Sequence, residues 1–316
     1  NEGSHFLEYQ SRDRVENLEI LRSTTVWMDA APPLTQLSIG PPKYDSGDGR
    51  PAFVSTVTVF SLSAEERGPI RSGLASTRYR IGTGSFVTGN PPSVFRLSGQ
   101  DGVYGIEYYS EDNVGNLEAQ RSISAFLDGT APELSHSFSI LPVVRPPKNE
   151  SWFPGNFNIV WSATDMASGP GGPASGLARV DAPSPVTQEG RGRGFTGRAE
   201  DRVGNQGQKS VSVNLDKTAP MVNAGLDFVV NEGSTASFSG SVTDNLDESP
   251  VYGWTFGDGG SISQVLKPEH VYLENGAYTA VLVSTDHAGH AASDAAVVSV
   301  LNAAPVIAVI QDKSAK

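Results

Sequence analysis

The five histidines of this sequence are the first residues to consider for chemistry, because imidazole can act as a base and as a metal ligand. They are His5, His136, His270, His287 and His290. The last two have the spacing His-x-x-His, but the turn expected to hold them offers no third ligand, so we expect both side chains to be solvated. No histidine by itself indicates a catalytic or metal centre.

The sequence patterns of common catalytic sites are absent. There is no Gly-x-Ser-x-Gly, no Gly-x-x-x-x-Gly-Lys, no His-Glu-x-x-His and no cysteine. The glycine-rich run at 190–194 precedes no predicted helix, so it is not a phosphate-binding loop. Glu65 and Glu66 lie in a predicted loop, where we expect solvated side chains rather than an acid/base pair. The sequence therefore predicts that this chain is not an enzyme.

Charge and hydropathy exclude two classes of partner. The chain has 35 acidic and 23 basic residues, a net charge of −12, and no basic cluster for a phosphate backbone. It has no run of about 18 apolar residues, and its first residues lack the features of a signal peptide. We expect neither nucleic-acid binding nor membrane insertion in this segment, and we expect any export signal to lie outside it.

The elements that position any site must be short strands. The 34 Gly and 21 Pro residues together make up about a sixth of the 316 residues, well above the usual share of about 12%. This composition is typical of strands joined by many turns and excludes a helical bundle. The length suits about three all-β modules of roughly 80 to 100 residues each.

One sequence pattern occurs three times and sets the organisation of the chain. Each copy has a strand with period-two alternation, a turn of the form Asp-x-Val-x-Asn, a second strand and a linker aspartate before a proline. The turn and linker aspartates are Asp13 with Asp29, Asp112 with Asp128, and Asp201 with Asp216. Their spacings are 16, 16 and 15 residues. This pattern predicts the final hairpin of a β-sandwich followed by a linker.

Residues 1–220 resemble the immunoglobulin-like repeats of bacterial surface proteins. Ser72-Gly73 and Ser175-Gly176 match the Ser-Gly that follows the second strand of such repeats, and the Asp-x-x-Gly-Asn turn and closing Asp-x-x-x-Pro also match. The sequence departs at Glu16, which replaces the turn glycine, and at Gly197, where the other copies carry tyrosine. The resemblance implies tandem immunoglobulin-like β-sandwiches, an all-β fold, arranged as an elongated rod.

Residues 221–301 resemble a PKD domain. The run Trp254-Thr-Phe256-Gly-Asp-Gly259 and the later His270-Val-Tyr272 carry this resemblance. Trp254 and Phe256 fall on one face of a strand as core residues, and His270 then has a structural role in that core.

The linker prolines Pro32, Pro132, Pro220 and Pro305 divide the chain. We expect the C-terminal hairpin of a truncated immunoglobulin-like domain at 1–33, two sandwiches at 34–132 and 133–220, and the PKD domain at 221–301. The last residues, 302–316, are expected to form the first strand of a following module.

The topology of an immunoglobulin-like sandwich would collect carboxylates where the chain enters each module. It would place Asp128 near Asp165 and Asp201, and Asp216 near a second acidic set. That set is Asp244, Asp247 and Asp286. Clustered carboxylates repel unless a cation joins them, and Ca²⁺ takes such oxygen ligands. We therefore predict Ca²⁺ at one or more module joints, with turn capping as the alternative role of these aspartates.

These observations favour a non-catalytic structural or adhesive segment of an extracellular or cell-surface prokaryotic protein. It would space modules or mediate cell-surface, filament or matrix contacts, and its partners would be other surface proteins, copies of itself, or extracellular polysaccharide or protein. The alternative is an accessory polymer-binding region of a secreted multidomain hydrolase. That alternative needs exposed aromatic side chains, but Trp27, Trp152 and Trp161 lie in predicted strands, where core packing is favoured.

Overall fold

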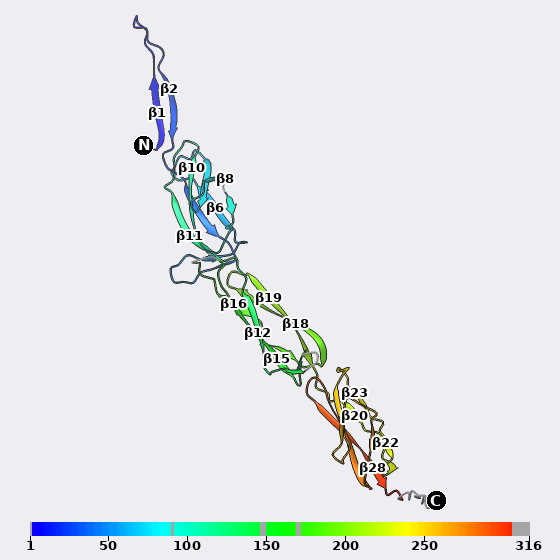
Figure 1. Ribbon diagram of the computed structural model, residues 1–316. Coiled ribbons are helices and arrows are strands. Elements are labelled where there is room, and N and C mark those ends of the chain that lie inside the picture. Colours follow the sequence, from blue (N-terminus) through cyan, green and yellow to red (C-terminus); the bar gives the residue numbers. More distant parts are fainter. Residues whose placement is uncertain (1, 90–91, 146–149, 169–171, 305–316) are drawn as a thin grey trace, which may run out of the picture. The chain divides into compact units, whose positions relative to one another are not determined.

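The protein is all-β (Figure 1). The computed structural model describes residues 2–89, 92–145, 150–168 and 172–304. Contacts divide the chain into two compact units. The first comprises Asn1–Ser135, Trp161–Asp181 and Gly197–Lys209, and the second comprises His136–Val160, Ala182–Thr196 and Ser210–Lys316. The described residues contain no helix long and apolar enough to cross a membrane. Most of the strand expected at 302–316 lies outside the described residues.

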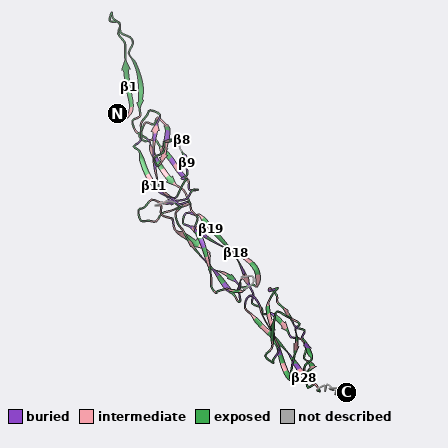
Figure 2. Ribbon diagram, viewed as in Figure 1, coloured by how far each residue is buried: buried purple, intermediate pink, exposed green. Residues whose placement is uncertain are grey.

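The N-terminal segment is a two-stranded antiparallel sheet of β1 (Gly3–Tyr9) and β2 (Arg22–Met28). Its side chains are exposed, as Figure 2 shows for both strands. Trp27 is 65% exposed and Phe6 is 68% exposed. The expectation that Trp27 packs in a core is therefore wrong, because no second sheet covers either face of this hairpin in the described part of the chain.

Residues 34–127 form a β-sandwich of two sheets. One sheet has the order β3 (Leu34–Ile39), β6 (Phe60–Glu65), β9 (Ser93–Phe95). The other has the order β4 (Lys43–Tyr44), β5 (Phe53–Val54), β11 (Arg121–Leu127), β10 (Gly102–Asp112), β7 (Leu74–Ile81), β8 (Val87–Gly89). Alternate residues of both sheets, among them Phe60, Leu62, Ile106 and Leu127, form one apolar core.

Residues 133–215 also form two sheets. The first has the order β12 (Glu133–Phe138), β15 (Phe157–Thr164), β17 (Ser184–Val186). The second has the order β13 (Val143–Arg145), β14 (Glu150–Phe153), β19 (Gln206–Leu215), β18 (Gly190–Asp201), β16 (Leu177–Val180). The boundary between the two compact units crosses four of these strands. Trp152 and Trp161 are buried, as the core interpretation expects.

The C-terminal module has three sheets around one core. The largest has the order β21 (Phe228–Asn231), β28 (Ala291–Leu301), β27 (Gly276–Thr285), β24 (Val251–Thr255), β25 (Ser261–Ser263). The two-stranded sheets pair β20 (Met221–Asn223) with β23 (Ser241–Thr243) and β22 (Thr235–Ser237) with β26 (Glu269–Val271). Trp254 and Phe256 are core residues, as expected.

His270 has the structural role expected of it. Its ring stacks on Phe256 with 4.1 Å between ring centroids, and its Nε2 lies 2.6 Å from Asp258 Oδ2. The Tyr272 hydroxyl donates to the Phe256 carbonyl at 2.9 Å. These contacts join the Gly-Asp-Gly turn to the core.

Gly197 is explained by Trp161. A Cβ placed on Gly197 would lie 2.2 Å from Cδ2 of the Trp161 indole. The indole therefore fills the space above the strand that a tyrosine side chain would need. The loss of the tyrosine at position 197 is therefore compensated in volume, because the large Trp161 of β15 packs against Gly197 of β18.

We predict that Gly197→Ala destabilises the protein by about 1–3 kcal/mol, because the indole cannot give way without leaving its packed position. Gly194→Ala is the matched control, since a Cβ at Gly194 meets nothing within 4 Å. Chemical denaturation of both variants measures the difference. Equal stabilities of the two variants would show that Trp161 does not restrict position 197.

Candidate cation sites

Three groups of side chains each bring their possible metal-ligand atoms within 4.8 Å of one another. Two groups consist of carboxylates, and the third has two carboxylates and a histidine. Each group contains a linker residue and a residue from the turn of a final hairpin. The groups are Asp29, Glu66 and Asp112; Asp128, Asp165 and Asp201; and Asp216, Asp286 and His290. Each lies within one compact unit, the first two in the first unit and the third in the second.

The hairpin turn fixes its own aspartate by local hydrogen bonds. Asp112 Oδ1 accepts the backbone N–H groups of Val114 at 3.0 Å and Asn116 at 2.8 Å, and its Oδ2 accepts Asn116 Nδ2 at 2.7 Å. Asp201 makes the same three bonds with Val203 and Asn205 at 2.9, 2.9 and 2.7 Å. This arrangement is an Asx turn, so the sequence alone determines where the carboxylate points.

The first copy keeps this turn despite its substitution. Asp13 Oδ1 accepts the N–H groups of Val15 and Asn17 at 2.9 Å each. Glu16 adopts a φ of 73°, close to the 87° of Gly115 and Gly204 at the equivalent position. The turn geometry is therefore retained, at the conformational cost of a side chain in the left-handed region.

Each of the linker aspartates Asp29 and Asp128 accepts two further hydrogen bonds, and the donors are equivalent at the two joints. Asp29 Oδ2 accepts the Ser72 N–H, and Asp128 Oδ2 accepts the Ser175 N–H, both at 2.7 Å. The turn asparagines donate to the linker backbone. Asn116 Nδ2 donates to Asp29 O at 3.1 Å, and Asn205 Nδ2 donates to Asp128 O at 2.9 Å. The Ser-Gly step, the linker and the turn are thus one hydrogen-bonded structure.

The structure brings Asp128, Asp165 and Asp201 together, as the topology argument expects. Asp128 and Asp201 are buried. Asp165 Oδ2 accepts the Gly176 N–H at 2.7 Å, whereas its buried Oδ1 has no hydrogen-bond partner among the described residues. Burial, and after it the charges of Asp128 and Asp201, raises the pKa of Asp165. Burial likewise raises the pKa of Asp201.

The group Asp29, Glu66 and Asp112 was not found from the sequence. Both carboxylate oxygens of Glu66 are buried without a hydrogen-bond partner among the described residues, so the expectation of a solvated Glu66 is wrong. Burial, then the charges of Asp112 and Asp29, raises the pKa of Glu66, against the effect of Arg71. The repeat itself held the signal, because Asp29 and Asp112 occupy the positions of Asp128 and Asp201.

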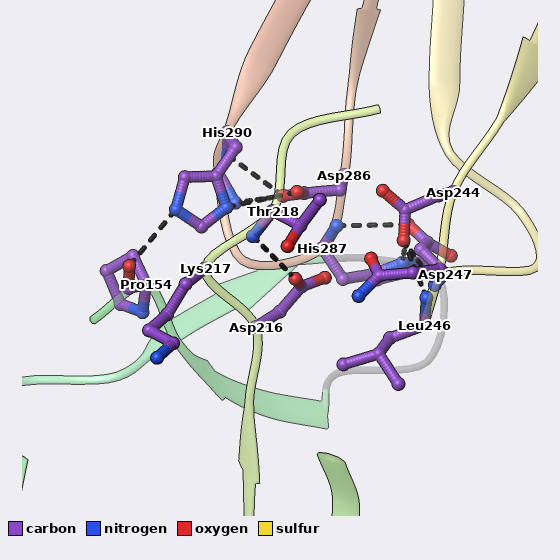
Figure 3. Close-up of polar contacts among 12 residues, drawn as sticks. Pro154, Asp216, Lys217, Thr218, Asp244, Leu246, Asp247, Asp286, His287 and His290 are labelled. Atoms are coloured by element: carbon purple, nitrogen blue, oxygen red, sulfur yellow. Dashed lines mark hydrogen bonds and ion pairs between the residues drawn. The ribbon is translucent and has the colours of Figure 1, made fainter. Parts of the chain in front are cut away.

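The third group differs from the expected set (Figure 3). Asp216 and Asp286 meet, and His290 joins them. Asp244 lies near enough for its charge to raise the pKa of Asp216. Asp247 instead contacts His287, with 2.5 Å between Oδ2 and Nδ1, and both residues are buried. The expectation that His287 is solvated is wrong, because its ring is buried against the Asp247 carboxylate.

Asp216 is the carboxylate of the third group whose pKa is strongly raised. It is 1% exposed, and its Oδ1 accepts the Thr218 N–H at 3.0 Å while Oδ2 has no partner among the described residues. Burial, followed by the charges of Asp244, Asp286 and Glu189, raises the pKa of Asp216 to about 6. A cation at Oδ2 would oppose this shift, because its positive charge stabilises the ionised carboxylate.

Comparison with known proteins assigns one part of the chain. Residues 217–300 match the sequence family of the PKD domain. These residues form a PKD domain. No curated protein matches the chain. The comparisons identify no catalytic domain.

Several solved structures of tandem β-sandwiches are similar to this chain. A tetra-tandem repeat from the extending region of a large adhesion protein is 19% identical, covering 94% of this chain and 81% of its own with a TM-score of 0.35. A 1.5-MDa bacterial ice-binding adhesin is 12% identical, with coverages of 86% and 100% and a TM-score of 0.33. A glucan-binding SGBP-B of Bacteroides ovatus is 15% identical, with coverages of 84% and 70% and a TM-score of 0.21.

The raised pKa of Asp216 predicts a pH dependence in EDTA. The folded pKa of about 6 exceeds the ordinary aspartate pKa of 3.8, so folding binds a proton between these pH values. This contribution to stability is complete below about pH 4 and is lost as the pH rises through 6. We expect the PKD domain to lose on the order of 2 kcal/mol from this residue by pH 7.

Asp216→Asn removes the titrating group. Melting curves in EDTA at pH 5 and pH 7 should therefore differ less for this variant than for the parent protein. Asp227→Asn, at an exposed carboxylate of the same domain, is the control and should keep the parent's difference. An unchanged pH dependence in Asp216→Asn would contradict the assignment.

Proposed function

We propose that this chain is a non-catalytic structural and adhesive segment of an extracellular or cell-surface prokaryotic protein. In this proposal, a hairpin at 1–33, sandwiches at 34–132 and 133–220 and the PKD domain at 221–301 succeed one another along the chain. The segment spaces modules and mediates contacts with surface proteins, with copies of itself, or with extracellular polysaccharide or protein.

The repeated joint is the observation that carries this proposal. The linker aspartates Asp29 and Asp128 make the same bonds to the next Ser-Gly step and to the next turn asparagine. Ordering the linker residues costs conformational entropy, and these hydrogen bonds help to offset that cost. A flexible linker would pay no such cost and would need no such bonds. A joint built the same way twice supports a spacing role, in which the orientation of each module matters.

We further propose that the two all-oxygen groups bind Ca²⁺. Asp29, Glu66 and Asp112 form one site, and Asp128, Asp165 and Asp201 form the other. Three carboxylates whose ligand atoms lie within 4.8 Å of one another repel. The oxygens of Glu66 and Asp165 that are buried without a hydrogen-bond partner among the described residues can take a ligand. Ca²⁺ accepts six to eight oxygen ligands with flexible geometry, so carboxylates, backbone carbonyls and water suit it. Bound Ca²⁺ would stiffen the joint by linking the linker to the turn.

Ca²⁺ should raise the melting temperature of the full chain, and Glu66→Gln should reduce this response while stabilising the protein in EDTA. The two effects have opposite signs because the substitution removes both a ligand and a repelling charge. Glu65→Gln is the matched control, since Glu65 is exposed on the neighbouring position. Parallel melts in Ca²⁺ and EDTA measure both effects, and superimposed melts of the parent protein would overturn the Ca²⁺ proposal.

The exposed aromatic face of the N-terminal hairpin supports the second candidate, an accessory polymer-binding region. Ser4 pairs with Trp27 and Phe6 pairs with Thr25, so Phe6 and Trp27 lie diagonally on one face of the sheet. Both are exposed. Flat aromatic pairs of this kind stack on sugar rings and other apolar surfaces, because they combine a large apolar area with little flexibility. Trp152 and Trp161 are buried and cannot serve in this way.

Binding to insoluble chitin, collagen and cell-wall material tests the adhesive function and distinguishes the two candidates. Retention on one polymer that falls roughly tenfold or more in Trp27→Ala would favour the polymer-binding region, since an anchor residue contributes 1.4 kcal/mol or more to such contacts. Leu226→Ala, at an 88% exposed residue elsewhere, is the control. Retention on whole cells that does not depend on Trp27 would favour contacts with surface proteins.

A further inference from the structure

His290 takes the place of the turn asparagine in the PKD domain. Asp286-x-x-Gly289-His290 aligns with Asp112-x-x-Gly115-Asn116. The turn is kept, because Asp286 Oδ1 accepts the N–H groups of Gly289 at 2.6 Å and His290 at 2.9 Å. In the other turns the asparagine side-chain amide donates a hydrogen bond to the aspartate Oδ2. His290 occupies the position of that donor.

The contacts of the His290 imidazole place its Nδ1 against a carboxylate oxygen, so a proton or a cation is required between these two atoms. His290 Nε2 lies 3.0 Å from the Pro154 carbonyl oxygen, which can only accept, so Nε2 carries a hydrogen. Nδ1 of a neutral ring is then a lone pair, and it lies 3.1 Å from Asp286 Oδ2, which is also a lone-pair atom. The two atoms attract only if a proton or a metal ion stands between them. Figure 3 shows the ring between Pro154 and Asp286.

A second feature points to a metal ion. Asp216, which is 1% exposed, has an Oδ2 without a hydrogen-bond partner among the described residues, and its ligand atom lies within 4.8 Å of those of Asp286 and His290. Asp244 Oδ2 is likewise buried without a partner in the described part of the chain. A proton shared between His290 and Asp286 would satisfy that pair alone and leave these buried oxygens unsatisfied.

We propose that Asp216, Asp286 and His290 bind a borderline divalent cation of the Zn²⁺ type, and that this site is separate from the two Ca²⁺ sites. A mixed set of one imidazole and two carboxylates suits Zn²⁺, whereas Ca²⁺ prefers oxygen ligands. The Pro154 carbonyl fixes the ring tautomer, as the outer partner of a metal-bound histidine does. Ligands of one tetrahedral Zn²⁺ lie about 3.4 Å apart at bond lengths of about 2.1 Å, so small side-chain movements suffice to close the site.

Binding of Zn²⁺ to the full chain at pH 7 tests this proposal independently of Ca²⁺ and of adhesion. Equilibrium dialysis followed by metal analysis should give one tightly bound Zn²⁺ that excess Ca²⁺ does not displace, together with a higher melting temperature of the PKD domain. His290→Asn should weaken Zn²⁺ binding at least tenfold and still fold, because it restores the asparagine of the other three turns. Asp216→Asn should also weaken binding.

His5→Asn is the matched control for zinc bound adventitiously to surface histidines, and it should retain the tight site. A ¹⁵N NMR spectrum adds a direct readout, since Zn²⁺ should shift His290 Nδ1 while Nε2 keeps its proton. Equal Zn²⁺ binding by His290→Asn and the parent protein would overturn the proposal. So would a His290 ring that keeps protons on both nitrogens at saturating Zn²⁺, which would establish an imidazolium–carboxylate pair instead.

Discussion

The structure depends on one local interaction, the turn in which an aspartate carboxylate accepts two backbone N–H groups ahead of it. In Asp112 and Asp201, Oδ1 accepts both backbone N–H groups and Oδ2 accepts the side-chain amide of an asparagine. The turn therefore fixes a charged group in a buried position. A buried carboxylate is stable only when hydrogen bonds or a counter-charge compensate it, and this requirement shapes what surrounds each turn.

The linker satisfies part of that requirement and becomes ordered in doing so. The same asparagine that bonds the turn aspartate also bonds the linker backbone, and the linker carboxylate accepts a serine N–H from the next sandwich. These bonds bring two negative groups together, and Glu66 or Asp165 adds a third. The residues that order the joint thus also place three carboxylates close together, and their mutual repulsion is what the proposed Ca²⁺ would relieve.

The PKD domain varies this design at one residue. Its turn aspartate also accepts two backbone N–H groups, those of Gly289 and His290, but His290 replaces the asparagine and directs its second nitrogen to Pro154. An amide supplies a hydrogen whatever the pH, whereas a neutral imidazole bonded through Nε2 supplies a lone pair. The change of one side chain therefore replaces a hydrogen-bond donor with a lone pair beside the carboxylate, and in our proposal a cation takes the place of the donated hydrogen.

Much of this protein was readable from the sequence, because the decisive features are local. Turn aspartates and linker prolines act within a few residues, so the hairpins and the all-β fold followed from spacing and composition. The PKD core followed from the resemblance that the Trp-x-Phe-Gly-Asp-Gly run carries. The group Asp128, Asp165 and Asp201 followed from topology. Glu66, His287 and His290 did not, because their environments depend on residues 40 to 136 positions away, such as Asp247 and Pro154. Trp27 was misjudged for the same reason, since burial requires a facing sheet that no strand pattern reveals. The sequence determined which groups cap the turns, and the tertiary structure decided which of them are left buried without a partner.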